Sequence, residues 1–360
     1  MIQLQSVSKR YGEKLAVQSI SLEVADGEVC VLIGPSGCGK TTTLRMINRL
    51  VEPTSGQILI DGNDTRASRP DVLRRSIGYA IQSVGLFPHM TVEQNIAVVP
   101  SILGWDHARI TQRVRDLLLM VGLDPKAHAA KYPVQLSGGE AQRVGVARAL
   151  AADPPILLMD EPFGAVDPLT RERLQRQFLA IQKDLKKTVV LVTHDMDEAV
   201  RLADRIALMR LGRLVQYDTP EVLLANPANM FVKNFVGADR ALKRISRIPV
   251  TTLLKPARSL VRGANGLVGE IPSTQRYAWV TDENGRLIGW VDTQSGMDAQ
   301  SITEIPAAEM DTMSVGESAS AREALSHMLG QGVRSIPVVD SQRRLVGEVT
   351  LRAIEEVTAG

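Results

Sequence analysis

The sequence has 360 residues, a length that suggests two or three domains. Hydrophobic residues make up 44% and charged residues 23%, which is ordinary for a globular protein and excludes collagen-like, low-complexity and disulfide-stapled chains. The formal net charge of +2 predicts no general affinity for polyanions. Two cysteines, Cys30 and Cys38, are too few to staple the fold, which favours reduced thiols in a cytosolic protein.

Neither the start of the sequence nor its apolar runs indicate a targeting or spanning segment. The first residues, MIQLQSVSKRYGEK, lack an apolar core of signal-peptide length. No uninterrupted apolar run reaches about 18 residues, the length that a transmembrane helix needs. If the protein serves a membrane, we expect it to do so as a peripheral subunit.

Strand and helix patterns alternate through the first two thirds of the chain. Three short, almost continuous apolar runs predict strands that are buried on both faces, at residues 28–33, 155–159 and 188–192. Helical patterns lie between and around them, at residues 41–50, 110–121, 139–151 and 170–185. This alternation predicts a doubly wound α/β domain.

A glycine-rich loop follows the first predicted strand and opens the first predicted helix. It reads GPSGCGKT and fits the phosphate-loop pattern G-x-x-x-x-G-K-[ST] in the required context. Lys40 can reach the β- and γ-phosphates, and the Thr41 hydroxyl can ligate Mg²⁺. The residues predicted to bind the nucleotide here are Gly34, Pro35, Ser36, Gly37, Cys38, Gly39, Lys40, Thr41 and Thr42.

The two cysteines are predicted to differ in reactivity. Cys38 lies in the phosphate loop, where the helix N-terminus and Lys40 favour a thiolate. We therefore expect a reactive thiol at Cys38, although a small filler residue is the alternative. Cys30 lies in a predicted buried strand and is expected to be inert.

Polar residues end the two later apolar strands. Asp160 and Glu161 follow the second strand, and in an α/β protein that position lies at the ligand-binding edge of the sheet. Asp160 is predicted to hold Mg²⁺, and Glu161 to accept a proton from the attacking water. His194, after the third strand, is predicted to hydrogen-bond the γ-phosphate and that water. The alternatives are an ordinary strand-end turn and a structural histidine.

A further motif separates this chain from ordinary phosphate-loop enzymes. Residues 136–143, LSGGEAQR, resemble the signature motif of ATP-binding cassette (ABC) proteins. The resemblance implies that this motif closes over ATP held by a partner subunit, so a head-to-tail dimer of the chain is expected. The residues that it assigns to the partner's ATP are Ser137, Gly138, Gly139 and Glu140.

Other marks of the ABC family occur in the expected order. Tyr11 resembles the aromatic residue that stacks on adenine, and Gln82 resembles the Q-loop residue that contacts Mg²⁺ and the attacking water. Asp167 resembles the D-loop residue at the dimer interface. Val166 stands where the family commonly has Leu, and Glu140 where it commonly has Gln.

The resemblance extends over residues 1–236 and implies a fold with three parts. These are a RecA-like core with a parallel sheet, an antiparallel β subdomain and a helical subdomain. It also implies ATP and Mg²⁺ as cofactors and ATP hydrolysis as the reaction.

Residues 137–168 resemble more closely the ATPase subunits of osmoprotectant importers, which handle glycine betaine, choline or carnitine. This implies transmembrane permease subunits as partners and, through them, an indirect functional link to a substrate-binding protein. It also implies a peripheral location on the cytoplasmic face of the inner (plasma) membrane. No nucleic-acid partner is expected. The uncharged segment at residues 83–90, which contains Phe87, is predicted to bind a short helix of the permease.

The C-terminal part repeats internally at an offset of 58 residues, with VTDENGRLIGWVD at 280–292 and VVDSQRRLVGEVT at 338–350. Each unit is predicted to form strand, polar turn and strand. Residues 263–360 resemble a tandem pair of CBS modules, a small α+β regulatory domain. Three glycines within residues 263–270 argue against a helix in the first unit. Neither unit has the acid that usually holds ribose, so adenosine binding and a purely structural or dimerising role both remain open.

Residues 237–262 are predicted to be a basic linker between the two domains. They contain seven basic residues and, from 240 onward, no acid, whereas residues 263–360 contain fourteen acids against seven arginines. The basic stretch is predicted to lie on anionic lipid, to pair with its own acidic domain, or to be a solvated linker. Its basic residues are Arg240, Lys243, Arg244, Arg247, Lys255, Arg258 and Arg262.

Three other functions compete with osmoprotectant import. The chain could energise an importer for another small solute. It could be a non-transport ABC ATPase of DNA repair or translation, although those usually have two cassettes or a long coiled coil. It could be a nucleotide-sensing regulator built around the repeat, but the set of Lys40, Asp160, Glu161 and His194 favours turnover.

Overall fold

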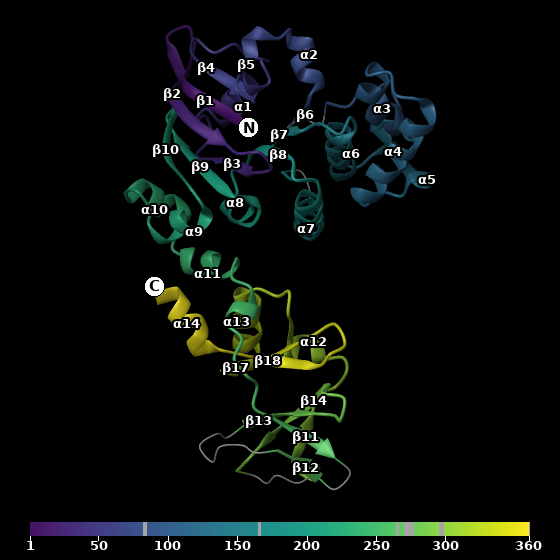
Figure 1. The fold of residues 1–360 in the computed structure, drawn as a ribbon, viewed down its shortest axis with the longest axis vertical. Coiled ribbons are helices and arrows are strands. Elements are labelled where there is room, and N and C mark those ends of the chain that lie inside the picture. The colour runs from purple at the N-terminus through teal and green to yellow at the C-terminus, as the bar shows by residue number, and fades with distance from the viewer. Residues whose placement is uncertain (82–84, 165–166, 264–265, 270–276, 295–298, 360) are drawn as a thin grey trace. The chain divides into compact units, whose positions relative to one another are not determined.

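The chain divides into two compact units, Met1–Gly237 and Ala238–Gly360 (Figure 1). The structure, a computed structural model, describes residues 1–81, 85–164, 167–263, 266–269, 277–294 and 299–359.

A six-stranded sheet forms the centre of the first unit, in the order β10-β9-β3-β8-β7-β6. All neighbours in it are parallel except β9 and β10. Every residue of β3, β7 and β8 is buried, as their unbroken apolar runs predict. The strands are β3 (Val29–Ile33), β6 (Ile77–Ala80), β7 (Ile156–Asp160), β8 (Thr188–Val192), β9 (Arg205–Arg210) and β10 (Arg213–Asp218).

The two faces of this sheet have separate cores. Alternate residues of β3 divide between them: Val29, Val31 and Ile33 join one core, and Cys30 and Leu32 join the other. The first core contains side chains of the helices α3 (Val92–Ile102), α4 (His107–Met120), α6 (Gly138–Leu150), α7 (Pro168–Leu185), α8 (Met196–Leu202), α9 (Pro220–Ala225) and α10 (Met230–Val236). The second core contains residues of α1 (Lys40–Ile47) and of an antiparallel sheet.

The antiparallel sheet has the strand order β2-β1-β4-β5. It packs its apolar residues on the second core, so that it covers one face of the parallel sheet. The strands are β1 (Ile2–Tyr11), β2 (Lys14–Val24), β4 (Ser55–Ile60) and β5 (Asn63–Asp64), followed by the short helices η1 (Thr65–Ala67) and α2 (Pro70–Arg75).

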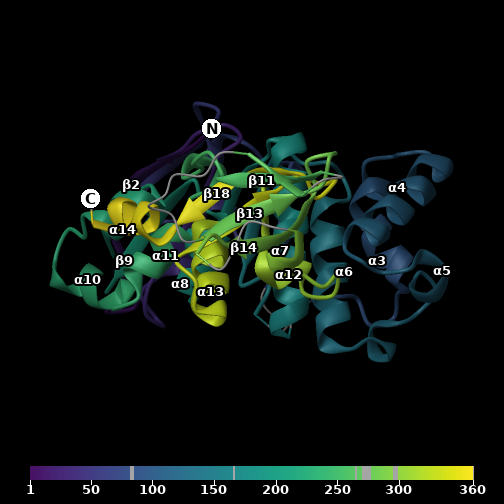
Figure 2. The same ribbon diagram turned by 90° about the horizontal axis from the view of Figure 1, so that it is seen from below.

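A helical part lies beside α6, where α3, α4 and α5 gather in both ribbon views (Figures 1 and 2). Its elements are α3 (Val92–Ile102), α5 (Pro125–His128) and η2 (Pro133–Gln135), and the unit ends with α9 (Pro220–Ala225) and α10 (Met230–Val236). The predicted three-part architecture is therefore confirmed.

The second unit contains a five-stranded sheet, β12-β11-β13-β14-β15, and a three-stranded sheet, β16-β17-β18. The strands are β11 (Ser259–Gly263), β12 (Gly266–Val268), β13 (Tyr277–Thr281), β14 (Leu287–Asp292), β15 (Ile302–Glu304), β16 (Val315–Gly316), β17 (Ser335–Val339) and β18 (Leu345–Thr350). The helices are α11 (Arg240–Ile245), η3 (Val250–Thr252), η4 (Ala299–Ser301), α12 (Met310–Met313), α13 (Ala321–Gln331) and α14 (Leu351–Ala359).

The internal repeat is visible in the pairing of these strands. Strand β11 is parallel to β13, which is antiparallel to β14, and β16, β17 and β18 pair in the same way. Val280 faces Gly289 in the first repeat, and Val338 faces Gly347 in the second. The prediction of strand, polar turn and strand in each repeat is confirmed.

The two polar turns are alike and contact each other. In each turn an aspartate side chain, Asp282 or Asp340, accepts hydrogen bonds from two backbone N–H groups further along. The turns are joined by two backbone bonds, from Leu287 N–H to the Arg343 carbonyl at 3.0 Å and from Leu345 N–H to the Gly285 carbonyl at 2.9 Å. The repeats therefore form one body.

The repeats differ in their helices. Helix α13 connects β16 to β17 in the second repeat, whereas residues 266–268 of the first repeat form strand β12, in line with the glycine content there. Residues 237–262, predicted to be a linker, contribute α11, η3 and β11 to the second unit. Ile245, Val250 and Leu253 are buried in its core. These apolar residues between the basic ones explain why residues 237–262 fold as part of the second unit.

Candidate nucleotide site

The phosphate loop connects the end of β3 to the start of α1. Gly34, Gly37 and Gly39 have positive φ values of 149°, 76° and 106°, a region that favours glycine. A Cβ atom at Gly34 would collide with the carbonyl oxygen of Met209, and one at Gly39 would approach the Ala16 carbonyl oxygen to 2.7 Å. The loop therefore curls tightly between β9 and β2, with its N–H groups at the N-terminus of α1.

Lys40 is held inside this curl. Its ammonium donates to the carbonyl oxygens of Gly34 at 2.7 Å and Pro35 at 3.2 Å, and the side chain is buried. A phosphate placed against the loop would meet a cation that is already ordered, which is how this motif binds β- and γ-phosphates.

The expectation of a thiolate at Cys38 is wrong. Its side chain is only 3% exposed, and its sulfur lies 3.9 Å from the Lys40 ammonium. Burial raises the pKa of Cys38, and this effect exceeds the opposing attraction of Lys40. Burial also raises the pKa of Cys30 to about 12, so the expected inertness of Cys30 is confirmed.

Thr41 and Asp160 meet at the predicted metal position. The Thr41 hydroxyl donates to Oδ1 of Asp160 at 3.0 Å, across from the start of α1 to the end of β7. Burial raises the pKa of Asp160, and the bond from Thr41 lowers it. A hydroxyl and a carboxylate are hard oxygen donors that suit Mg²⁺. The residues described contain no group of three His, Cys, Asp or Glu side chains arranged for a metal, so an ion here would need phosphate and water oxygens as well.

Glu161 and His194 face each other beside this pair. His194 Nδ1 lies 3.3 Å from Glu161 Oε1, and the two side chains are 67% and 22% exposed. Glu161 has a positive φ of 49°, unusual for a residue with a side chain. Its N–H donates to the Val192 carbonyl at 2.9 Å, and its carbonyl accepts from Gln142 Nε2 at 2.9 Å. Gln142 belongs to the motif at 136–143, but the sequence assigns it no role, because its partner is a backbone oxygen.

A cavity of about 460 Å³ joins these residues. Tyr11, at the end of β1, is 48% exposed at its rim, as expected of a residue that stacks on a base. Lys14 and Ala16, which sequence motifs did not reveal, also line the cavity. The lining residues are Tyr11, Lys14, Ala16, Ser36, Gly37, Gly39, Lys40, Thr41, Thr42, Glu161 and His194.

The signature residues do not line this cavity. Ser137 is the N-cap of α6, and it exchanges two hydrogen bonds with Glu140, of 3.3 Å and 2.7 Å. Ser137 and Gly138 are exposed. His128 Nε2 lies 3.0 Å from Glu140 Oε1. Hydrogen bonds from Ser137, and then from His128, lower the pKa of Glu140 to about 2.

The predicted D-loop residue, Asp167, does not line the nucleotide cavity. Asp167 caps α7 by accepting the Thr170 N–H at 3.0 Å, outside the nucleotide cavity. Gln82 and Val166 lie outside the described residues.

Asn95 and Arg148 hold residues 85–91, which follow the Q-loop, through hydrogen bonds to their backbone. Buried Asn95 accepts the Phe87 N–H at 2.8 Å and donates to the carbonyl oxygens of Phe87, Met90 and Thr91. Arg148, near the end of α6, donates to the Gly85 carbonyl at 2.7 Å. Phe87 itself is 41% exposed.

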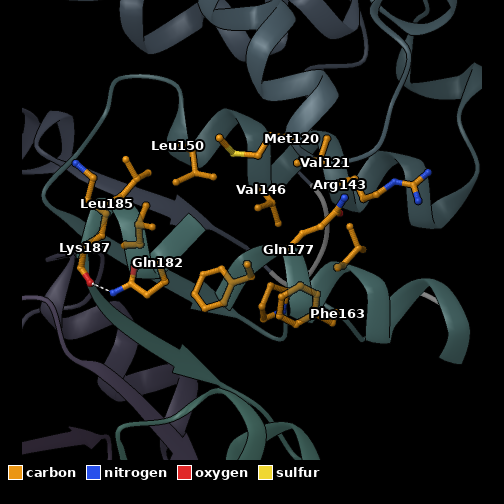
Figure 3. A pocket seen from close by; sticks show the side chains of 14 residues that line it. Met120, Val121, Arg143, Val146, Leu150, Phe163, Gln177, Gln182, Leu185 and Lys187 are labelled. Atoms are coloured by element: carbon orange, nitrogen blue, oxygen red, sulfur yellow. Dashed lines mark hydrogen bonds between the residues drawn. The ribbon is translucent and has the colours of Figure 1, made fainter. Parts of the chain in front are cut away.

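A second cavity lies between α6 and α7, and Met120, Val146 and Phe163 are among the side chains that line it (Figure 3). Its volume is about 40 Å³ and its lining is largely apolar. A space of this size matches a packing gap between the helical part and the sheet rather than a substrate site.

None of the helices in the described part of the chain is long and apolar enough to span a membrane.

Comparisons with known proteins agree with this geometry. Residues 17–164 match the family model of the ABC transporter, and residues 303–359 match that of the CBS domain. The chain is 47% identical to an osmoprotectant import ATP-binding protein of Salmonella typhimurium, over 97% of this chain and 94% of the relative. It is 44% identical to a glycine betaine/carnitine/choline transport ATP-binding protein of Bacillus subtilis, over 99% and 96%.

Solved structures resemble the first unit. A dimeric bacterial ABC transporter cassette is 36% identical, with a TM-score of 0.58 over 61% of this chain and 98% of that one. A dimeric cassette in a post-hydrolysis state, bound to ADP and phosphate, is 34% identical, with a TM-score of 0.57 over 61% and 98%.

Proposed function

This chain belongs to the family of ATP-binding subunits of osmoprotectant ABC importers, and we propose that two copies hydrolyse MgATP between them in head-to-tail fashion. It is the ATPase subunit of such an importer. One observation carries the proposal: the nucleotide cavity contains the phosphate loop, Glu161 and His194 but not the signature residues, which lie elsewhere with Ser137 exposed. The site is therefore incomplete within one chain.

Binding of the triphosphate rests on the loop and its helix. The N–H groups around Gly37 and Gly39 and the positive end of α1 attract phosphate oxygens, and Lys40 adds a full charge. Mg²⁺ would be held by Thr41 and Asp160, where it would neutralise charge on the phosphates. Tyr11 would stack on the base.

Hydrolysis requires a group that accepts a proton from water. The Glu161 carboxylate lies at the cavity wall, and its backbone is fixed by β8 and by Gln142. A base held in one place can accept the proton without reorganisation. His194, 3.3 Å from Glu161, would orient the water and the γ-phosphate.

Transmission to the permease would use the segment that Asn95 fixes. Phe87 is exposed there, and Arg148 ties the segment to the signature helix α6. Movement of α6 on closing over the partner's ATP would thus reach the surface offered to the permease. We place the chain peripherally on the cytoplasmic face of the membrane, where ATP is available.

The basic stretch at 240–262 bears on lipid contact. Arg262 donates to Glu304 at 2.7 Å, and Lys243 pairs with Asp239 at 2.6 Å, so two of its charges are paired within the second unit. Only the Arg262–Glu304 contact pairs the basic stretch with the acidic residues 263–360, because Asp239 belongs to residues 237–262 themselves. That contact supports pairing with the acidic domain over a surface wholly available to anionic lipid.

Mixed dimers test the composite site. We expect Lys40→Ala and Ser137→Arg each to abolish ATPase activity of the reconstituted transporter when only one variant is present. A mixture should regain activity, because a mixed dimer has one site with an intact loop and an intact signature motif. No recovery in the mixture, with dimers shown to form, would place both motifs of each site in one chain.

The identity of the transported solute can be tested with the same transporter reconstituted in lipid vesicles. With the cognate permease and binding protein, glycine betaine, choline or carnitine uptake should depend on ATP. ATP-driven uptake of a different solute, with no uptake of these three, would favour the alternative of another small-solute importer.

A further inference from the structure

Three aromatic residues share one face of the second unit's larger sheet. Trp279 on β13 lies directly opposite Trp290 on β14, and Tyr277 is two residues before Trp279, so all three point to the same side. The other side carries Ala278, Val280 and Val291, which are buried with Leu260 in a small aliphatic core. The aromatic face is not part of that core, although Trp279 and Trp290 also pack against a separate small cluster of Leu287, Ile305, Met310 and Val339.

This face lines a cavity of about 470 Å³, within the range of small-ligand sites. The Tyr277 and Trp290 rings meet edge to face, with centroids 5.5 Å apart. The remaining lining comes from α12 and from the second repeat. The lining residues are Tyr277, Ala278, Trp279, Trp290, Met313, Gln331, Gly332, Val333, Arg334, Ser335 and Glu348.

The cavity also contains a buried carboxylate. Glu348, on β18, is 8% exposed, and its Oε2 accepts the Trp279 indole N–H at 2.9 Å. A carboxylate shielded from water is costly unless charge or hydrogen bonds compensate it. A cation in the cavity would supply that charge beside aromatic rings that also attract cations.

We propose that this cavity binds a quaternary ammonium compound, of the class that the importer's relatives transport. The choice of class rests on the proposed function, but the chemistry is that of the cavity. Aromatic rings together with an acid recognise quaternary ammonium groups. The whole chain has only three tryptophans, and two of them are here.

Arg334 refines the proposal. It is the cation that the described lining offers, so it would pair with the carboxylate of a zwitterion such as glycine betaine or carnitine. Choline has no carboxylate and would use the rings and Glu348 alone. A nucleotide fits less well, because its phosphates would share with Glu348 a cavity in which Arg334 is the cation that the described lining offers.

Tryptophan fluorescence can follow binding in the full-length chain. A Trp105→Phe background leaves Trp279 and Trp290 as the only emitters, and Trp105 lies in the first unit against Arg109. Choline, glycine betaine and carnitine should change the emission in a saturable way, with calorimetry as a second measurement. The neutral isostere 3,3-dimethyl-1-butanol should bind roughly 10-fold more weakly than choline, because it lacks the charge.

Variants locate the binding. Trp290→Leu and Glu348→Gln should each weaken choline binding roughly 10-fold or more, while Arg334→Gln should weaken glycine betaine and carnitine binding but not choline binding. The Trp105→Phe change should leave affinity by calorimetry unaltered. Retained ATPase activity and an unchanged circular dichroism spectrum show that each variant is folded.

Three results would overturn the proposal: no saturable signal with any of the three compounds, equal affinity for the neutral isostere, or unchanged choline affinity in both Trp290→Leu and Glu348→Gln. Because the assay needs neither ATP nor permease, failure of the mixed-dimer or uptake experiments would leave it interpretable.

Discussion

The two units carry their candidate sites in different ways. In the first unit the polar residues follow the carboxyl ends of β3, β7 and β8, so parallel pairing brings Lys40, Asp160 and His194 to one edge. In the second unit the aromatic residues lie on the face of an antiparallel pair, and cross-strand register brings Trp279 and Trp290 together. One site depends on loop position and the other on register.

This difference has a physical consequence. A loop at a sheet edge can bind charge through its own backbone N–H groups, so the first site needs glycines and a helix N-terminus. A strand face has its N–H groups in the ladder and offers only side chains, so the second site needs large rings and a carboxylate. Damage to one site should therefore leave the other intact.

Removing the proton acceptor should have the largest effect. Glu161→Gln keeps the shape of the side chain, so ATP binding should survive while hydrolysis falls by roughly 10²-fold or more, and an ATP-bound dimer should accumulate. ATPase assays and gel filtration measure this. Glu172→Gln, on α7 and paired with Arg201, is the matched control and should behave like the unchanged chain. Near-normal turnover in Glu161→Gln would remove Glu161 from the mechanism.

A methyl group between two strands should damage only the second unit. The Cβ of Gly289→Ala would collide with the Thr303 carbonyl oxygen, which opens the pairing of β14 with β15. We expect a loss of about 1–3 kcal/mol in the unfolding free energy of that unit. Chemical denaturation in the Trp105→Phe background, followed by Trp279 and Trp290 emission, measures it.

Gly316→Ala serves as the control for this change, because a Cβ there has no atom within 4 Å. ATPase activity should be the same in both variants. If Gly289→Ala lowers ATP turnover as well as the stability of the second unit, while Gly316→Ala lowers neither, the two units do not act separately.

The sequence predicts which segments gather at the first site because its motifs are contiguous, while the roles of their residues stay predictions. The phosphate loop, Glu161 and His194 line one cavity, and Asp160 meets that loop through its hydrogen bond with Thr41. What it misses depends on packing. The state of Cys38 is decided by burial, and Gln142 acts on a backbone oxygen, so residue type alone reveals neither.

The second unit was less predictable for a related reason. The repeat fixes the strands and turns, because Asp282 and Asp340 initiate the same turn. The aromatic cavity combines residues of both repeats, Trp290 from one and Glu348 from the other, which no local pattern links. The basic stretch looked like a linker because its charges outnumber the few apolar residues that anchor it.

A rise in pH should destabilise the first unit through Glu198, a buried acid four residues beyond His194. Glu198 accepts the Thr193 hydroxyl at 2.8 Å, and burial raises the pKa of Glu198 to about 7. Asp195 adds to this rise, while Arg171 and His194 oppose it. Because the folded-state pKa lies above the ordinary value near 4.5, the stabilisation is complete below about pH 4.5 and is lost as pH rises to about 7.

Glu198→Gln should remove this dependence. The amide oxygen can still accept the Thr193 hydroxyl, so we expect the variant to be more stable than the unchanged chain by about 1–2 kcal/mol at pH 7.5 and similar at pH 5. Unfolding of the first unit measured at both values checks this. An equal loss of stability between pH 5 and 7.5 in both proteins would mean that another group is responsible.

The smallest effect is expected at the signature motif, where this chain has a carboxylate. Glu140 is ionised at neutral pH because its pKa lies at about 2, and in a dimer its motif would approach the partner's negatively charged phosphates. His128 holds the carboxylate from α5 at 3.0 Å, and its other ring nitrogen lies 3.0 Å from the Asp124 carbonyl oxygen. We therefore expect His128→Ala to raise the KM for ATP about 2- to 5-fold, the size of a modest hydrogen-bonded pair.

A double-mutant cycle distinguishes this from simple loss of packing. Glu140→Gln removes the charge that His128 holds. Because the family commonly has Gln at this position, this change alone should alter the KM for ATP very little. In that background His128→Ala should no longer raise the KM, because there is no carboxylate left to restrain. If His128→Ala raises the KM for ATP equally with Glu and with Gln at position 140, the histidine only supports α5, and the charge at the signature motif needs no restraint.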